Sequence, residues 1–325
     1  MRKHIGFILF ITCIILFPLS YGKIDPFSLK VLIPIGIYTI LAISLDLLIG
    51  YAGQISLGHA GFYALGAYAS GLSTVKLHLS PIFGMAVSIA SVFVVALIIG
   101  LTVLRLKGYY FIIATLSFGI IVVGLITSLP TEITGGGTGL SGIPDFSAFG
   151  FDFDSATKYF YLVWAFVILT LITSYGIVQS RFGRAICAIH TDELAASCMG
   201  INPTKYKVQI FVFSAVLAGL SGTLFAHYLK FLAPDDFSLF VSIDIIIMVF
   251  VGGVGTIFGS VLGAFLIKML PELLYRLKDY ELLAHGTILI LILVFLPGGL
   301  WGFLDYCRSR LKGLFKYETT DRQAL

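Results

Sequence analysis

Charged side chains are scarce in this sequence. Asp, Glu, Lys and Arg together make up 12% of the residues, whereas a soluble domain carries about 25%. Hydrophobic residues make up 58%, and the mean hydropathy is +1.01. This balance excludes an ordinary soluble domain and predicts a polytopic protein in contact with membrane lipid. The basic residues do not gather on one polar face, so nothing predicts nucleic-acid binding.

Paired cysteines and the common motifs of catalytic sites are also missing. The four cysteines, at positions 13, 187, 198 and 307, show no paired spacing, so we expect free thiols. The sequence contains neither the nucleotide-binding pattern GxxxxGK[ST] nor HExxH, and no His/Cys cluster. We therefore expect no enzyme activity of its own, no cofactor and no metal site.

Long apolar runs are abundant instead. A membrane-spanning helix needs about 20 apolar residues, and ten segments are candidates: 5–21, 29–49, 57–74, 82–104, 109–129, 159–178, 208–229, 242–256, 259–275 and 284–304. The first could also be a cleaved signal peptide, but we favour a retained span. The predicted fold class is an all-α integral membrane bundle of about ten transmembrane helices, forming one domain over residues 1–325.

Basic residues between the spans predict the orientation. With the N-terminus inside, thirteen Lys and Arg residues lie in cytoplasmic segments and seven lie in outer ones. Cytoplasmic loops carry the excess of positive charge. Both termini, the basic tail 305–325 and the segment 179–207 are therefore predicted in the cytoplasm. The segment 130–158 becomes the longest extracytoplasmic loop.

We call residues 179–207 the polar island, because they separate two long apolar runs. Thr191 is predicted to N-cap a helix over about 192–199, with acidic residues in its first turn, and Gly200 is predicted to end it. A capped helix with small residues on one face suits contact with another protein, although a solvated linker is the alternative. The candidate contact residues are Arg184, Asp192, Glu193, Ala195, Ala196 and Gly200.

Two glycine-broken stretches lie within the apolar runs, at 49–70 and 251–264. Glycine-broken helices with polar groups at membrane depth are typical of a transport path, whereas close helix packing through small residues is the alternative. The candidate pathway or gate residues are Asp46, Gln54, Ser56, His59, Gly252 and Gly255. Asp46 and Asp244 are also acids within the spans, of the kind that an ion-coupled secondary transporter would require.

The outer loop 130–158 reads PTEITGGGTGLSGIPDFSAFGFDFDSATK. Its glycines and prolines exclude a regular helix. The loop is acidic and aromatic, so it is either a solvated loop or a docking face for an extracytoplasmic partner. Gly136 and Asp145 are the candidate docking residues.

The tetrapeptide GLSG at 219–222 raises the alternative of an intramembrane serine protease. His227 follows Ser221 by six residues, which does not match the three- or four-residue spacing of one helix face. His285 is the remaining candidate base. We favour small-residue helix packing for this segment.

Several separated motifs together resemble one known family. They are YAGQISLGHAGFYALGAY, TGGGTGLSGIP, FSAVLAGLSGTLFA, GGVGTIFGSVLGA and the island pattern Glu-x-Ala-Ala-x-x-x-Gly that begins at Glu193. These are similar to the permeases of ATP-binding-cassette (ABC) importers for branched-chain amino acids, and the TGGGTGLSGIP loop resembles the LivM type more than the LivH type.

The resemblance implies a bundle of the type II-like importer kind in a bacterial or archaeal inner membrane. It also implies a heterodimer with a second permease, two cytoplasmic ATP-binding subunits and an extracytoplasmic substrate-binding protein. In this family the helix of the polar island would dock on the ATPase. Permeases for urea and short amides are close relatives, so the substrate stays open between these classes.

Overall fold

The computed structural model describes residues 26–106, 108–148 and 150–273, together with isolated residues between 286 and 305. The expected span 5–21 lies outside the described residues. The expected span 284–304 is described only in part, and the tail lies outside the described residues from 306 onward.

Each of the other eight expected spans coincides with a helix. These are α2 (Pro26–Asp46), continued by the π-helix η1 (Leu47–Tyr51), then α3 (His59–Val75), α4 (Pro81–Val103), α5 (Tyr109–Ser128), α7 (Ala156–Gln179), α10 (Pro203–Leu229), α11 (Leu239–Gly252) and α12 (Ile257–Leu273). Five helical segments of the described chain are long and apolar enough to cross a membrane. The helical membrane fold is thereby confirmed, while the total of ten spans stays a prediction.

Helix α11 is the shortest of these helices. Its 14 residues give a length of about 21 Å, less than the roughly 30 Å of a bilayer core. It ends at Gly253, whose φ of +116° is open mainly to glycine. The chain then turns into α12, so the second glycine-broken stretch contains the turn of a helix hairpin.

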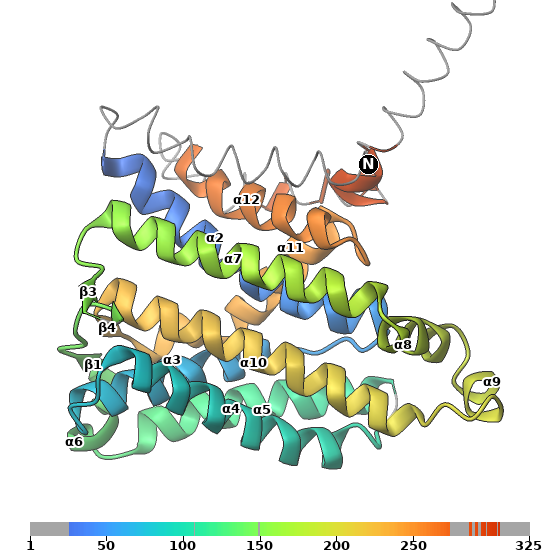
Figure 1. Ribbon diagram of the computed structural model, residues 1–325, viewed down its shortest axis with the longest axis horizontal. Coiled ribbons are helices and arrows are strands. Elements are labelled where there is room, and N and C mark those ends of the chain that lie inside the picture. Colours follow the sequence, from blue (N-terminus) through green and yellow to red (C-terminus); the bar gives the residue numbers. More distant parts are fainter. Residues whose placement is uncertain are drawn as a thin grey trace, which may run out of the picture.

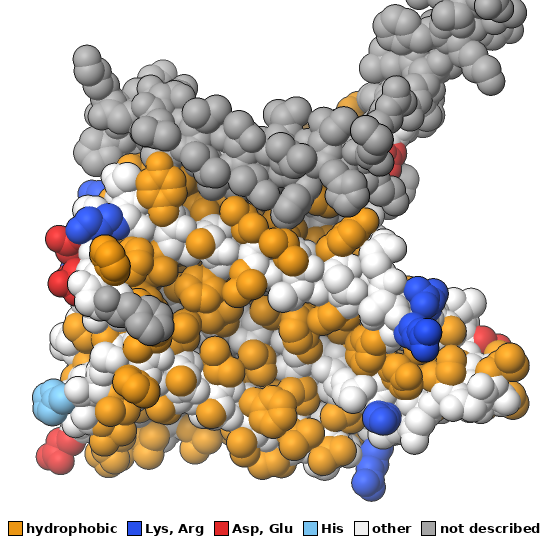
Figure 2. All heavy atoms as spheres, viewed as in Figure 1, with side chains coloured by type: hydrophobic (Ala, Val, Ile, Leu, Met, Phe, Trp, Pro, Cys, Tyr) orange, Lys and Arg blue, Asp and Glu red, His pale blue; other side chains and the backbone are white. Residues whose placement is uncertain are grey.

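The long helices lie side by side along one direction, as Figure 1 shows. Helices α8 (Arg181–Thr191) and α9 (Glu193–Cys198) lie at one end of the bundle, which we call the island end. The short elements of the outer loop lie at the opposite end, which we call the loop end. Hydrophobic side chains cover the flank between the ends, and charged side chains gather near the ends (Figure 2). This is the distribution that a bilayer imposes on a helical bundle.

Helices α2 and α10 form the centre of the bundle. In the most apolar stretch of each span, 89% of the residues of the α2 span and 83% of those of α10 are buried, compared with 22% in α4 and 22% in α5. A helix that is hydrophobic all round belongs inside a protein. Helices α4 and α5 instead present broad apolar faces outward, to lipid or to a partner chain.

Small residues bring α3 and α10 together. A Cβ added to Gly66 would overlap the backbone of Gly219, and one added to Gly222 would overlap the carbonyl of Tyr63. Between membrane helices, such close approach supplies the packing energy that the hydrophobic effect supplies in water. The GLSG segment therefore packs helix on helix, as we favoured from the sequence.

The loop end is built from short pieces. They are α6 (Thr131–Thr134), η2 (Gly136–Thr138), β1 (Leu140–Ser141), β2 (Ser147–Ala148), β3 (Phe151–Asp152), β4 (Phe231–Leu232) and η3 (Pro234–Phe237). Strand β1 pairs antiparallel with β4, and β2 pairs antiparallel with β3. The expectation of no regular helix in the loop is wrong at Thr131–Thr134, where the residues ahead of Gly135 form the single turn of α6. Leu140, Ile143 and Phe146 are buried, so the middle of the loop folds into the bundle rather than into solvent.

Candidate functional site

The polar island contains two helices, where the sequence analysis expected one. Helix α8 begins at a cap in which Ser180 Oγ accepts hydrogen bonds from the N–H groups of Phe182 and Gly183. Its buried residues include Gly183, Ile186 and Ile189, at the spacing of one helix face. That spacing, together with the serine before it, is the sequence signal that could have found α8.

The cap of α9 differs from the prediction. Asp192 Oδ1 accepts the N–H groups of Leu194 at 2.9 Å and Ala195 at 3.0 Å, so Asp192 is the N-cap. Thr191 is the last residue of α8, and its hydroxyl donates to the carbonyl of Cys187 at 3.0 Å. The Thr191 prediction is wrong because α8 continues through this residue.

The end of α9 follows the prediction. Gly200 has a φ of +82°, and its N–H donates to the Ser197 carbonyl at 3.0 Å. The N–H of Ile201 donates to the Ala196 carbonyl at 3.1 Å. These two bonds make a Schellman motif, which satisfies the last carbonyls of the helix.

Two of the predicted contact residues of α9 are held against the rest of the protein. Ala196 is buried, and Glu193 forms a 2.9 Å ion pair with Lys207 of α10. Together with the Asp192 cap, they hold the island from within. The largest exposed side chains are Leu194 and Met199, which are 78% and 83% exposed. The sequence analysis did not single them out.

Two other predicted island residues lie at the surface. Ala195 and Arg184 are exposed. The Arg184 guanidinium donates to the Gln179 carbonyl at 3.1 Å, across the turn between α7 and α8. Arg184 therefore helps to fix the angle at which the island leaves α7.

The two glycine-broken stretches, which are only weakly similar in sequence, meet in space. Gly50 in η1 packs on Gly255 so closely that a Cβ on Gly50 would overlap the Gly255 backbone. Asp46 is buried, and its Oδ1 accepts the N–H of Gly255 at 2.7 Å. Gly252 packs in the same way on the Gly259 carbonyl, closing the α11–α12 hairpin. Asp46, Gly252 and Gly255 thus belong to one junction.

Two of the remaining pathway candidates, Gln54 and Ser56, lie on the chain between η1 and α3, and the third, His59, is the first residue of α3. Gln54 and Ser56 are buried, whereas Gly53 and Ile55 between them are exposed. His59 Nε2 lies 2.9 Å from the hydroxyl of Ser214 in α10, which in turn donates to the Ser44 carbonyl in α2. His59 therefore joins three central helices.

A cavity of about 330 Å³, half open to the surface, lies between α3, α5, η3 and α11. Its lining is mainly apolar and includes Leu57, Ala60, Ile120, Val123, Phe237 and Leu239. Ser242 also lines it, and its hydroxyl accepts the N–H of Ala60 at 3.1 Å. None of the six predicted pathway residues lines this cavity.

One more ionisable pair lies between α11 and α12. Lys268 Nζ is 3.6 Å from the carboxylate of Asp244 and 3.7 Å from the ring centroid of Tyr38 in α2. Ionisable residues within membrane spans require such partners. The sequence analysis singled out Asp244 but not its cation, because their pairing depends on two different helices.

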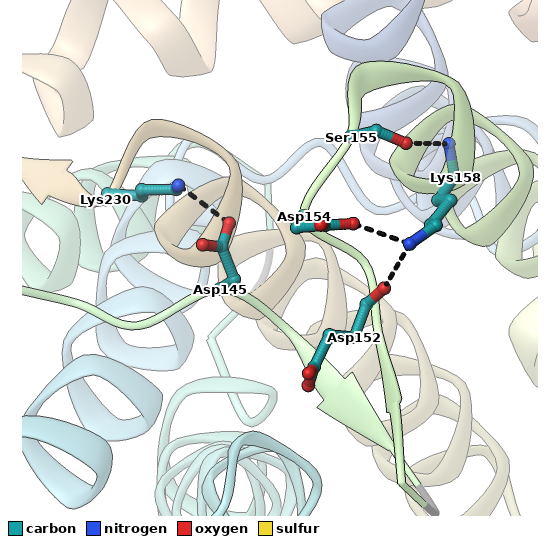
Figure 3. Close-up of polar contacts among 6 residues, drawn as sticks. All are labelled: Asp145, Asp152, Asp154, Ser155, Lys158 and Lys230. Atoms are coloured by element: carbon teal, nitrogen blue, oxygen red, sulfur yellow. Dashed lines mark hydrogen bonds and ion pairs between the residues drawn. The ribbon is translucent and has the colours of Figure 1, made fainter.

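Ion pairs hold the loop end, as Figure 3 shows. Lys230 Nζ lies 2.7 Å from Asp145, and Lys158 Nζ lies 2.7 Å from Asp154 and 3.2 Å from the Asp152 carbonyl. The hydrogen bond and positive charge of Lys158 lower the pKa of the Asp154 carboxyl. The side chain of Asp152 points away from Lys158 (Figure 3).

The two predicted docking residues differ in access. Asp145 is partly exposed within its ion pair. Gly136 is buried, has a φ of +54° and donates its N–H to Thr134 Oγ1. Gly136 therefore shapes the turn and does not offer a contact surface.

His227 of α10 links the outer loop to α3. Its Nε2 lies 3.0 Å from Ser70 Oγ, and its Nδ1 lies 2.9 Å from the Pro144 carbonyl. Ser221 instead donates to the Ile37 carbonyl at 2.9 Å. Ser221 and His227 therefore do not form a nucleophile–base pair. The other candidate base, His285, lies outside the described residues.

Comparison with known proteins agrees with this architecture. Residues 27–297 match the family described as branched-chain amino acid transport system / permease component. The high-affinity branched-chain amino acid transport system permease proteins LivM of Salmonella typhimurium and Escherichia coli are each 34% identical to the chain over 279 residues, which cover 77% of this chain. The LivH permease protein of Escherichia coli is 26% identical over 144 residues, covering 43% of this chain and 46% of its own length.

The chain spans 64% of the length of the two LivM proteins. No solved structure matches it. The match over residues 27–297 and the identity to LivM both confirm the resemblance predicted from the motifs, and the chain belongs to the branched-chain amino acid transport system permease family.

Proposed function

We propose that this chain is a LivM-type, membrane-spanning subunit of an ATP-driven importer for branched-chain aliphatic amino acids. The family match carries this proposal, and the doubly capped helix α9 supports it. The partners would be a second permease subunit, two ATP-binding subunits and an extracytoplasmic binding protein. The chain would couple ATP hydrolysis by its partners to movement of the substrate.

In this proposal, the ATP-binding subunit docks on α9. The caps fix both ends of α9, and the Glu193–Lys207 ion pair joins α9 to α10. Leu194 and Met199 would then fill an apolar groove of the partner. Burying one such side chain contributes about 1.5–3 kcal/mol, so the two together would contribute about 3–6 kcal/mol to the contact.

The cavity between α3, α5 and α11 is the proposed place for the aliphatic side chain. Its volume of about 330 Å³ lies at the lower end of the range for small-molecule sites. Its mainly carbon lining favours leucine, isoleucine or valine over urea or a short amide. The junction of Asp46, Gly252 and Gly255 would form a gate nearer the island end, beside Gln54, Ser56 and His59.

The island end would face the cytoplasm, in a bacterial or archaeal inner membrane. The loop end would then receive the binding protein, with Asp145 and Asp152 as its accessible acids.

The docking proposal can be tested with the variant Leu194→Glu/Met199→Glu in the complete transporter reconstituted in liposomes. Charge at both positions should abolish docking, so ATP-dependent leucine uptake should fall at least about tenfold, while the permease still inserts. Thr191→Glu adds a charge at an exposed position of the neighbouring helix, and it should leave uptake unchanged. Unchanged uptake in the double variant would remove α9 as the docking site.

The substrate class can be tested in the same liposomes. Labelled leucine should accumulate upon ATP addition, and an excess of valine or isoleucine should compete with it. Accumulation of urea without accumulation of leucine would favour the amide and urea alternative.

A further inference from the structure

His190 of the polar island lies directly on Gly53 of the bundle. A Cβ added to Gly53 would overlap the His190 ring, with Nε2 at only 2.8 Å. Gly53 also has a φ of +67°, a conformation that favours glycine. The ring and the backbone therefore meet with no space between them.

Helix α8, which ends just after His190, connects the two parts that this contact joins. Its buried face, with Ile186 and Ile189, rests against the bundle. Along its length α8 contacts α7, α10, α9 and η1. A displacement of α9 can therefore reach η1 through α8 without passing through the centre of the membrane.

The π-helix η1 lies between His190 and the second glycine-broken stretch. It ends two residues before Gly53. Through Gly50 and the hydrogen bond from Gly255 to Asp46, it touches the α11–α12 hairpin. A π-helical turn holds one residue more than an α-turn and is often found at functional sites. It can take up a shift of one residue without breaking the helix around it.

We propose that His190 is a positioning residue that passes movement of the island to η1, and through Asp46 and Gly255 to the α11–α12 hairpin. This inference rests on the proposed ATP-driven function. The ring itself performs this role, because its Cδ2 and Nε2 atoms fill the space over Gly53.

The first test compares His190→Ala and His190→Phe in the complete transporter, reconstituted in liposomes, by measuring leucine uptake per ATP hydrolysed. His190→Ala removes the contact, so the ratio should fall about fivefold or more, with ATP hydrolysis retained. His190→Phe keeps a ring and should keep the ratio within about twofold of the original protein. A normal ratio in His190→Ala would overturn the inference.

The second test substitutes Gly53, the other residue of the contact. Gly53→Ala should also lower uptake per ATP hydrolysed. Gly108→Ala is the matched control, because Gly108 has a similar φ of +59° with nothing within 4 Å of an added Cβ. Gly108→Ala introduces the backbone strain without the steric contact, so it should keep the ratio of leucine uptake to ATP hydrolysis. An equal loss in both alanine variants would assign the effect to strain and overturn the role of the contact.

These outcomes also separate the inference from the proposed function. If the unaltered complex shows no ATP-dependent uptake, the proposed function fails. If the unaltered complex couples uptake to ATP and His190→Ala couples equally well, only the transmission through His190 fails. Since His190 is exposed, its variants keep the test available even where Gly53→Ala does not fold.

Discussion

At the scale of single residues, Asp46 shows how one buried group joins two helices. Its carboxylate oxygen accepts the Gly255 N–H at 2.7 Å, and the residue is fully buried. The sequence allowed a pathway residue, an ion-coupling residue or a helix-terminal group at this position. Its partner is 209 residues away along the chain, which is why no local pattern could identify it.

The bond to Gly255 predicts opposite outcomes for two substitutions of Asp46. Asp46→Ala leaves the Gly255 N–H without its acceptor and should destabilise the protein by about 1–3 kcal/mol. Asp46→Asn keeps an acceptor oxygen and removes a buried charge, so it should match the unaltered protein or exceed it in stability. Thermal unfolding of the purified protein in detergent compares them. Equal losses in both variants would show that the charge, and not the acceptor, is required.

At the scale of elements, the packing of α3 on α10 depends on glycines that face backbone atoms. Gly222→Ala would push a methyl group into the Tyr63 carbonyl. Because neither backbone can move freely, this overpacking should lower the free energy of unfolding by about 1–3 kcal/mol. The midpoint of thermal unfolding should fall by several degrees.

Gly176→Ala in α7 is the matched control for this substitution. Gly176 is also a helical glycine, but nothing lies within 4 Å of an added Cβ. Alanine there should leave the unfolding midpoint unchanged or raise it slightly. A similar loss in both variants would mean that glycine content, and not the α3–α10 contact, sets the stability.

The elements also show which parts of the fold could be predicted from the sequence. Apolar runs predicted eight of the observed helices, because span length is fixed by the bilayer. Gly200 was predicted correctly because a Schellman motif is a local structure. Helix α8 was missed because its apolar face is short and lies among charged residues. The His190–Gly53, His227–Pro144 and Lys268–Asp244 contacts were missed because each depends on how helices pack.

At the scale of the whole molecule, the two ends of the bundle should lie on opposite sides of the membrane. Native Cys198 in α9 and a new cysteine at Asp152→Cys report on the two ends, each placed in a background without the other cysteines. A membrane-impermeant maleimide should label Asp152→Cys in intact cells. It should label Cys198 only after the membrane is opened, and the reverse pattern would invert the proposed orientation.

The length of α10 has a consequence for the whole transporter. Its 27 residues form one continuous rod of about 40 Å, from the island beside Lys207 to His227 beneath the outer loop. Energetic coupling between two sites is reciprocal. If the proposed partners bind at its two ends, α10 would couple their binding free energies in both directions. Under the proposed function, we therefore expect occupancy of the loop end to change the affinity for nucleotide at the island end.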